Sequence, residues 1–263
     1  MVDSEPMDTG LKGRTAVVPG ASSGLGLAVA RALAAEGANV VLGGRRGELV
    51  REEASKLPAA VGVEIDLTDP GATDALVGAA QDHFGPVDVL VLNGGGPPPG
   101  VAVDFTPEQL ADAIALLVQP HQRLVQAVLP GMRGRRFGRI VAIGSSGVQA
   151  PIERLVASNA ARAALAGYLK TLSTEVAADG VTVNMVLPGR IATDRVGVLD
   201  RANAERSGKS EEEVREQAKS AIPAGRYGTP EEFAAVVTFL ASTAASYVTG
   251  EQIRCDGGLV RSH

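Results

Sequence analysis

The sequence predicts an α/β fold in which a parallel sheet is covered by helices on both faces. Short apolar segments alternate with helical segments along the chain, and most of the apolar segments are hydrophobic throughout. The first of them, residues 15–18, is followed by three closely spaced glycines and then by a helical pattern. We find no internal repeat or linker. The chain is therefore expected to form one domain over residues 11–263, preceded by a flexible segment 1–10.

The remaining elements follow from the hydrophobic patterns and from helix-start signals. Further strands are expected at 39–42, 61–65, 87–92, 139–143, 181–187 and 252–255. Helices are expected at 25–36, 48–56, from Thr68, at 106–132 with a bend at Pro120, at 153–178, and at 229–241. Thr106 and Thr229 each precede a proline and lie three residues before Gln109 and Glu232, which predicts capping boxes. The charged segment 194–222 is predicted to be helical in pieces.

Composition excludes several function classes. The chain has 263 residues, 45% of them hydrophobic, and a net charge of −5, so it does not resemble a nucleic-acid-binding protein. The basic cluster 133–139 is interpreted as a solvated helix end. The single cysteine, Cys255, excludes an internal disulfide and a cysteine-rich metal site, and no metal is predicted. No apolar run reaches the ~18 residues of a membrane span, and residues 1–10 lack a signal-peptide core. We expect a soluble cytoplasmic protein.

The glycine-rich stretch indicates the most specific chemistry. Gly20, Gly24 and Gly26 lie between the first apolar segment and the first helix. In that arrangement glycines let backbone N–H groups approach a pyrophosphate, and the helix N-terminus favours its negative charge. Glycines also serve ordinary turns, so the motif alone leaves a purely structural role open.

Motifs along nearly the whole chain resemble the short-chain dehydrogenase/reductase (SDR) family. They are the glycine motif at 20–26, Asp66, Asn93-Gly94-Gly95, Pro188–Thr193, the 222–232 segment, Thr249-Gly250 and Asp256-Gly257-Gly258. Pro19 stands where the family usually has Thr. The resemblance implies a Rossmann-like, doubly wound parallel sheet of seven strands in the order 3-2-1-4-5-6-7. It also implies a bound nicotinamide dinucleotide.

The resemblance further implies cofactor contacts, subunit contacts and a substrate loop. Carried over residue by residue, the cofactor set is Gly20, Ser22, Ser23, Gly24, Leu25, Gly26, Arg45, Arg46, Asp66, Leu67, Asn93, Gly94, Gly95, Arg162, Pro188, Gly189, Ile191 and Thr193. The helices that start near Thr106 and Glu153 carry the family's usual subunit contacts, which implies a homotetramer, or a homodimer if these contacts are disrupted. The segment 194–222 occupies the position of the mobile substrate loop, and its sequence identifies no substrate.

The residues after the second strand favour NADP(H) over NAD(H). NAD-dependent members place an acid there to hold the ribose 2′-hydroxyl, whereas this chain has Gly44 followed by Arg45 and Arg46. A guanidinium binds a 2′-phosphate that a carboxylate would repel. The alternative interpretation is that the two arginines are solvated residues at a helix start.

The catalytic positions depart from the family's Ser, Tyr, Lys and Asn. Ser145 matches the family serine, but the family spacing places the tyrosine and lysine at Ser158 and Arg162, and the asparagine near Leu117. A serine hydroxyl is a much weaker acid than tyrosine, whose pKa is about 10, and arginine does not release its proton. Ser158 and Arg162 keep the one-turn spacing of the pair. His121 follows Leu117 by one turn and is predicted either to supply acid/base chemistry or to lie at the surface or a subunit contact.

Three functions are consistent with these substitutions. The first is an atypical NADPH-dependent reductase of a carbonyl substrate, such as a 3-oxoacyl thioester or another ketone. Its catalytic candidates are Ser145, Ser158, Arg162 and His121, with water as an alternative proton source. The second is a non-redox dehydratase, isomerase or cyclase on the same fold. The third is a catalytically silent dinucleotide-binding protein.

Overall fold

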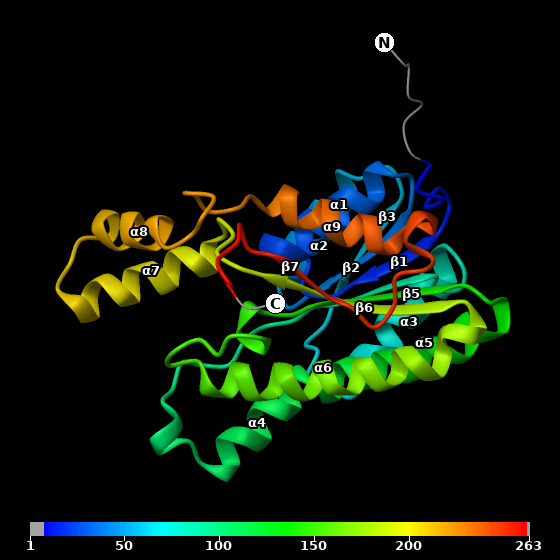
Figure 1. The fold of residues 1–263 in the computed structure, drawn as a ribbon. Helices are drawn as coiled ribbons and strands as arrows, with labels where there is room; N and C mark the ends of the chain where they lie inside the picture. The colour runs from blue at the N-terminus through cyan, green and yellow to red at the C-terminus, as the bar shows by residue number, and fades with distance from the viewer. Residues whose placement is uncertain (1–7, 262–263) are drawn as a thin grey trace.

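A computed structural model of the chain describes residues 8–261. Its centre is a seven-stranded sheet in the order β3-β2-β1-β4-β5-β6-β7, with every neighbouring pair parallel (Figure 1). The predicted fold class and strand order are confirmed. The strands are β1 (Thr15–Val18), β2 (Asn39–Gly44), β3 (Ala60–Glu64), β4 (Val89–Leu92), β5 (Gly138–Ile143), β6 (Val181–Pro188) and β7 (Gln252–Cys255).

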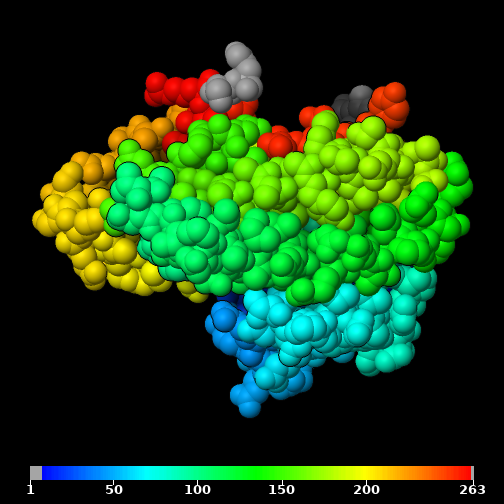
Figure 2. All heavy atoms as spheres, turned by 90° about the horizontal axis from the view of Figure 1, so that it is seen from below, coloured from blue at the N-terminus to red at the C-terminus, as the bar shows by residue number. Residues whose placement is uncertain are grey.

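Helices cover the sheet on both faces. One face carries α1 (Gly24–Ala35), α2 (Gly47–Ser55) and α9 (Pro230–Ala241). The other face carries α3 (Ala72–His83), α5 (Gln119–Arg135) and α6 (Val156–Val176). Helix α4 (Pro107–Leu117) packs outside this layer, against α5 and α6. Helices α7 (Asp194–Ser207) and α8 (Glu211–Ser220) lie together at one end of the molecule (Figures 1 and 2).

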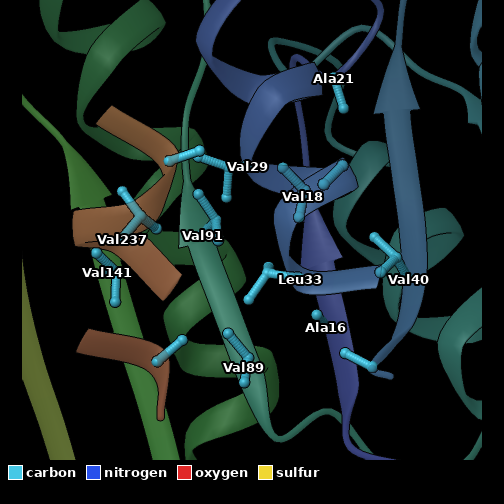
Figure 3. Packing of buried hydrophobic residues seen from close by; sticks show 14 of the residues in the cluster. Ala16, Val18, Ala21, Val29, Leu33, Val40, Val89, Val91, Val141 and Val237 are labelled. Carbon is cyan, nitrogen blue, oxygen red and sulfur yellow. The ribbon is translucent and has the colours of Figure 1, made fainter. Parts of the chain in front are cut away.

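The two covered faces explain the uninterrupted apolar strands. Ala16 and Val18 of β1 belong to the cluster under α1 and α9, whereas Val17 belongs to the cluster on the opposite face. Figure 3 shows the first cluster, in which Leu33 of α1 and Val237 of α9 lie over the strands. Since successive side chains point to opposite faces, a strand covered on both sides needs an apolar residue at every position.

Three predicted helix boundaries are wrong. The single bent helix over 106–132 is two helices, α4 and α5, which meet at Val118. Pro120 lies in the first turn of α5, where its missing N–H breaks no helical hydrogen bond. Helix α6 starts at Val156 rather than at Glu153, and α3 starts at Ala72 rather than at Thr68. The predicted capping boxes at Thr106 and Thr229 are present.

The basic cluster and the N-terminal segment also need correction. Arg133 is exposed at the end of α5 as predicted, but Arg139 is only 3% exposed in β5. Its guanidinium donates hydrogen bonds to backbone carbonyls, including that of Ser242, so it is part of the structural core. In the predicted flexible segment 1–10, Thr9 is buried and its hydroxyl donates to Glu36, so the prediction does not hold there. Residues 1–7 lie outside the described part of the chain.

The parallel arrangement brings the carboxyl ends of all the strands to one edge of the sheet. The strand order reverses between β1 and β4, and ligands of open α/β sheets bind in the crevice at that point. Within the described residues, no helix combines the length and the hydropathy that a bilayer crossing requires.

Candidate active site

The turn between β1 and α1 forms one wall of the crevice. Gly20 and Gly24 have positive φ angles of 63° and 59°, which glycine adopts without strain. A Cβ atom on Gly26 would lie 2.3 Å from the carbonyl oxygen of Gly20 and 2.6 Å from Nδ2 of Asn93. That amide nitrogen donates to the carbonyls of Pro19 and Gly20, at 3.0 and 3.2 Å. The turn is therefore held closed from β4, with the N-terminal amides of α1 behind it.

A cavity of about 710 Å³ extends from this turn toward β2 and β3. Asp66 lies on its wall and accepts hydrogen bonds from the backbone N–H of Thr68 at 3.0 Å and from its hydroxyl at 2.8 Å. These bonds lower the pKa of Asp66, and the nearby charge of Arg45 adds to the effect. Asp66 is therefore an ionised acceptor fixed in position at the rim, suited to an adenine amine or a ribose hydroxyl.

The two arginines after β2 lie on the wall of the same cavity. Arg46 donates to the hydroxyls of Ser22, at 2.9 Å from Nη2, and Ser23, at 2.7 Å. Arg45 is exposed and forms no ion pair with any residue in the range 8–261. One guanidinium and two serine hydroxyls thus form a cluster, with a second guanidinium on the wall of the same cavity, and this donor set fits a phosphate.

A second cavity, of about 320 Å³, lies over the carboxyl ends of β4, β5 and β6. Ser145, Ser158 and Arg162 are all on its wall. Arg162 donates from Nη1 to the carbonyl of Ile143 at 2.8 Å and from Nε to Oγ of Ser158 at 3.3 Å. Burial lowers the pKa of Arg162 to about 10, and the charge of Arg195 contributes, so the guanidinium is charged at neutral pH.

Both serine hydroxyls already accept a hydrogen bond from the protein. Oγ of Ser145 accepts from the backbone N–H of Gly147 at 3.1 Å, and Oγ of Ser158 accepts from Arg162. A hydroxyl has one hydrogen to donate besides its lone pairs. In both residues that hydrogen is free to point into the cavity, where it can stabilise negative charge on a ligand oxygen.

His121 does not lie at the surface, which corrects one of the two predictions made for it. It is 2% exposed in α5, and Nδ1 lies 2.7 Å from the carbonyl oxygen of Leu117, so Nδ1 carries the proton. Burial lowers the pKa of His121 to about 4. The side chain is thus neutral near pH 7, and it is not on the wall of either cavity, so the prediction that it is a catalytic acid is not supported.

Every other predicted site residue lines one of the two cavities. Residues on the wall of the smaller cavity are Gly20, Ser23, Gly24, Leu25, Gly26, Asn93, Gly94, Ser145, Ser158, Arg162, Pro188, Gly189, Ile191 and Thr193. Residues on the wall of the larger one include Ser22, Arg45, Arg46, Asp66, Leu67 and Gly95. The two cavities share Gly20, Ser23, Gly94 and Arg195, so they adjoin each other along the glycine turn.

Comparison with known proteins agrees with this geometry. The family described as enoyl-(acyl carrier protein) reductase matches residues 20–260. The 3-oxoacyl-[acyl-carrier-protein] reductase FabG of Vibrio cholerae is 36% identical over 257 residues, which cover 95% of this chain and 98% of FabG. The chain belongs to the short-chain dehydrogenase/reductase family.

Solved SDR-like structures superpose closely. The L-sorbose reductase of Gluconobacter frateurii, in complex with NADPH and L-sorbose, has a TM-score of 0.91 and 32% identity, covering 98% of this chain and all of that one. YwfH, an NADPH-dependent reductase involved in bacilysin biosynthesis, has a TM-score of 0.89 and 30% identity, covering 95% and 99% of the two chains.

Sequence reasoning missed Arg195 of this SDR chain. Arg195 lies in the first turn of α7 and is on the wall of both cavities. The only sequence signal was its position in the charged segment 194–222, where many similar charges face solvent. Sequence reasoning also missed how α7 is anchored: Asp200, 1% exposed, accepts from Arg190 at 2.6 Å and from the hydroxyl of Tyr227 at 2.9 Å.

Proposed function

We propose that this SDR protein is an NADPH-dependent reductase of a carbonyl compound. The observation that carries the proposal is the contact of Arg46 with Ser22 and Ser23, which joins the arginine after β2 to the glycine turn. No acid stands at Gly44, where NAD-dependent proteins hold the ribose 2′-hydroxyl. The NADPH-dependent or NADPH-bound structural relatives support the same cofactor.

The catalytic half would act through Ser145, Ser158 and Arg162. NADPH supplies the hydride when it is bound. The hydroxyls of Ser145 and Ser158 donate to the carbonyl oxygen of the substrate and stabilise the negative charge that develops on it. Arg162, bonded to Ser158, makes that hydroxyl a better donor because a positive charge lies directly behind it. The proton that completes the alcohol comes from solvent through Ser158, which takes over the position that the family gives to tyrosine.

Titration calorimetry with NADPH and NADH tests the cofactor assignment. A charge-assisted bond to phosphate contributes about 1.5–3 kcal/mol, so Arg46→Gln should weaken NADPH binding roughly 10- to 100-fold and leave NADH binding unchanged. Arg51→Gln, in the helix α2 that starts directly after Arg46 but away from both cavities, is the matched control. Equal affinity of the wild-type protein for both dinucleotides would contradict the assignment.

Oxidation of NADPH in the presence of ketones then tests the reaction itself. Turnover that falls in Ser145→Ala and Ser158→Ala, with NADPH binding retained, would support the proposed roles. Selective NADPH binding without turnover of any ketone or thioester would favour the silent dinucleotide-binding alternative. A redox-neutral product would favour the dehydratase, isomerase or cyclase alternative.

The assembly and the location are separate proposals. We propose a homotetramer built through α4 and α6, in the cytoplasm. Exposed apolar side chains near this surface, Val103 and Leu110, support a subunit contact there. Light scattering of the purified protein measures the mass directly, and a monomer would contradict the proposal.

A further inference from the structure

Arg162 carries a half-buried charge on the wall of the catalytic cavity, and no acidic residue balances it. Its two hydrogen-bond acceptors, the carbonyl of Ile143 and the hydroxyl of Ser158, are both neutral. It forms no ion pair with any residue between 8 and 261. A charge that is partly withdrawn from water is usually stabilised by a partner of opposite charge, because desolvation without one is costly. The missing partner of Arg162 is expected to arrive with a ligand.

Arg195 adds a second unbalanced charge to the same cavity. Its guanidinium extends from α7 to the loop after β4, where a Cβ atom on Gly96 would lie 2.1 Å from Nη2. Within the described part of the chain it has neither a hydrogen bond nor an ion pair. Two like charges that share a cavity repel each other. An anion bound between them is attracted to both, and these two attractions outweigh the repulsion.

The surroundings of the catalytic cavity are also basic, although the whole chain has a net charge of −5. A neighbouring cavity of about 950 Å³ shares the wall residues Ile152, Leu155, Val196 and Leu199 with it. The acidic residues that line the two are Glu153 and Asp194, and the arginines are Arg154, Arg162, Arg190, Arg195, Arg206 and Arg261, of which Arg190 is paired with Asp200 behind the wall. Such a lining attracts anions and repels cations.

The phosphates of the cofactor have partners elsewhere in the site. The glycine turn and the N-terminus of α1 suit the pyrophosphate, and Arg45 and Arg46 suit the 2′-phosphate. Arg162 lies instead beside Ser145 and Ser158, at the end of the cavity where the reacting carbonyl binds under the proposed function. The anion that balances Arg162 is therefore expected to belong to the substrate rather than to the cofactor.

We propose that the substrate is an oxo acid whose carboxylate is bound by Arg162 and Arg195 and whose apolar part lies against Ile152, Leu155, Val196 and Leu199. This inference rests on the proposed function, since the ketone of the same molecule is the group to be reduced. A guanidinium pair recognises a carboxylate through bidentate, charge-assisted bonds, which an ester or a thioester accepts only weakly.

Matched acid and ester pairs test the proposal. Acetoacetate and 2-oxohexanoate, each with its methyl ester, are titrated into the NADP⁺-saturated protein, in which no turnover occurs. At least one acid is expected to bind at least tenfold more tightly than its ester, and Arg195→Gln should remove that preference. Arg201→Gln, an exposed residue of α7 outside both cavities, should keep it. Esters that bind as tightly as their acids, or a preference that survives in Arg195→Gln, would overturn the proposal.

The same variants separate a substrate carboxylate from a cofactor phosphate. If Arg195→Gln weakens NADP⁺ binding tenfold and leaves the acid preference intact, the anion is a phosphate and the proposal is wrong. Failure of the proposed function looks different: the acids then bind selectively and are never reduced by NADPH.

Discussion

The two halves of the crevice differ in the groups that line them, which are mainly backbone groups in one half and side chains in the other. On the β1 side, the proposed binding groups are mainly backbone amides of a turn whose shape depends on glycines and on the Asn93 side chain, with the Arg46 side chain beside it. On the β5–α6 side, they are the side chains of Ser145, Ser158 and Arg162. A turn that depends on glycine conformations tolerates almost no other residue type. By contrast, two helix positions one turn apart keep their relative placement when their side chains are replaced by others of different chemistry. The second half is therefore where we expect substitutions of the family's catalytic residues.

The largest effect is expected from a side chain placed in the glycine turn. Gly26→Val puts atoms where the Gly20 carbonyl and the Asn93 amide already lie, so the turn must open. Overpacking of about 3 kcal/mol corresponds to a loss of NADPH affinity on the order of 100-fold, measurable by calorimetry. Gly134→Ala, in open space on α5, should leave binding unchanged. Wild-type affinity in Gly26→Val would show that the backbone is not the binding element.

A smaller effect is expected beside the catalytic half, from His121. Its pKa is about 4 in the folded protein and about 6.5 unfolded, so the unfolded chain binds more protons between these values. The contribution of the neutral His121 to the free energy of unfolding is present above pH 6.5 and is lost as the pH falls toward 4. Between pH 7 and 4.5 the wild-type protein should lose about 2 kcal/mol of unfolding free energy relative to His121→Gln.

Urea unfolding at the two pH values measures this difference. His83→Gln, at the exposed end of α3, is the control and should follow the wild-type protein, because this side chain is in solvent in the folded state as well. Parallel pH profiles for wild type and His121→Gln would show that His121 is not held neutral.

The smallest effect is expected at the anchor of α7, which borders the catalytic half more than the cofactor half. Tyr227→Phe removes a hydrogen bond to the buried carboxylate of Asp200 and should cost about 1.5 kcal/mol of unfolding free energy. NADPH affinity should change little, because Arg45, Arg46 and the glycine turn are not touched. Tyr247→Phe, at a fully exposed position, should change neither quantity. A large loss of NADPH binding in Tyr227→Phe would mean that the two halves are coupled.

The fold class and most of the residues on the site wall could be predicted from the amino-acid sequence alone. Three local patterns carried this prediction: the apolar strands, the glycine spacing and the capping boxes. Each of them favours one backbone conformation within its own segment. The residues of the predicted cofactor set all line the two cavities, because the ends of parallel strands meet at one edge of the sheet.

The surroundings of the charged and polar side chains could not be predicted in this way, because they depend on how distant segments pack together. The patterns around Pro120, Arg139 and His121 suggested a bent helix, a solvated cation and an accessible or surface histidine. The structure has a helix start, a buried arginine bonded to carbonyls and a buried neutral imidazole. Arg162 and Arg195 are 33 positions apart in the chain and share one cavity. Burial and charge balance depend on neighbours distant in sequence, so no local pattern could reveal that these two arginines lack a counter-ion.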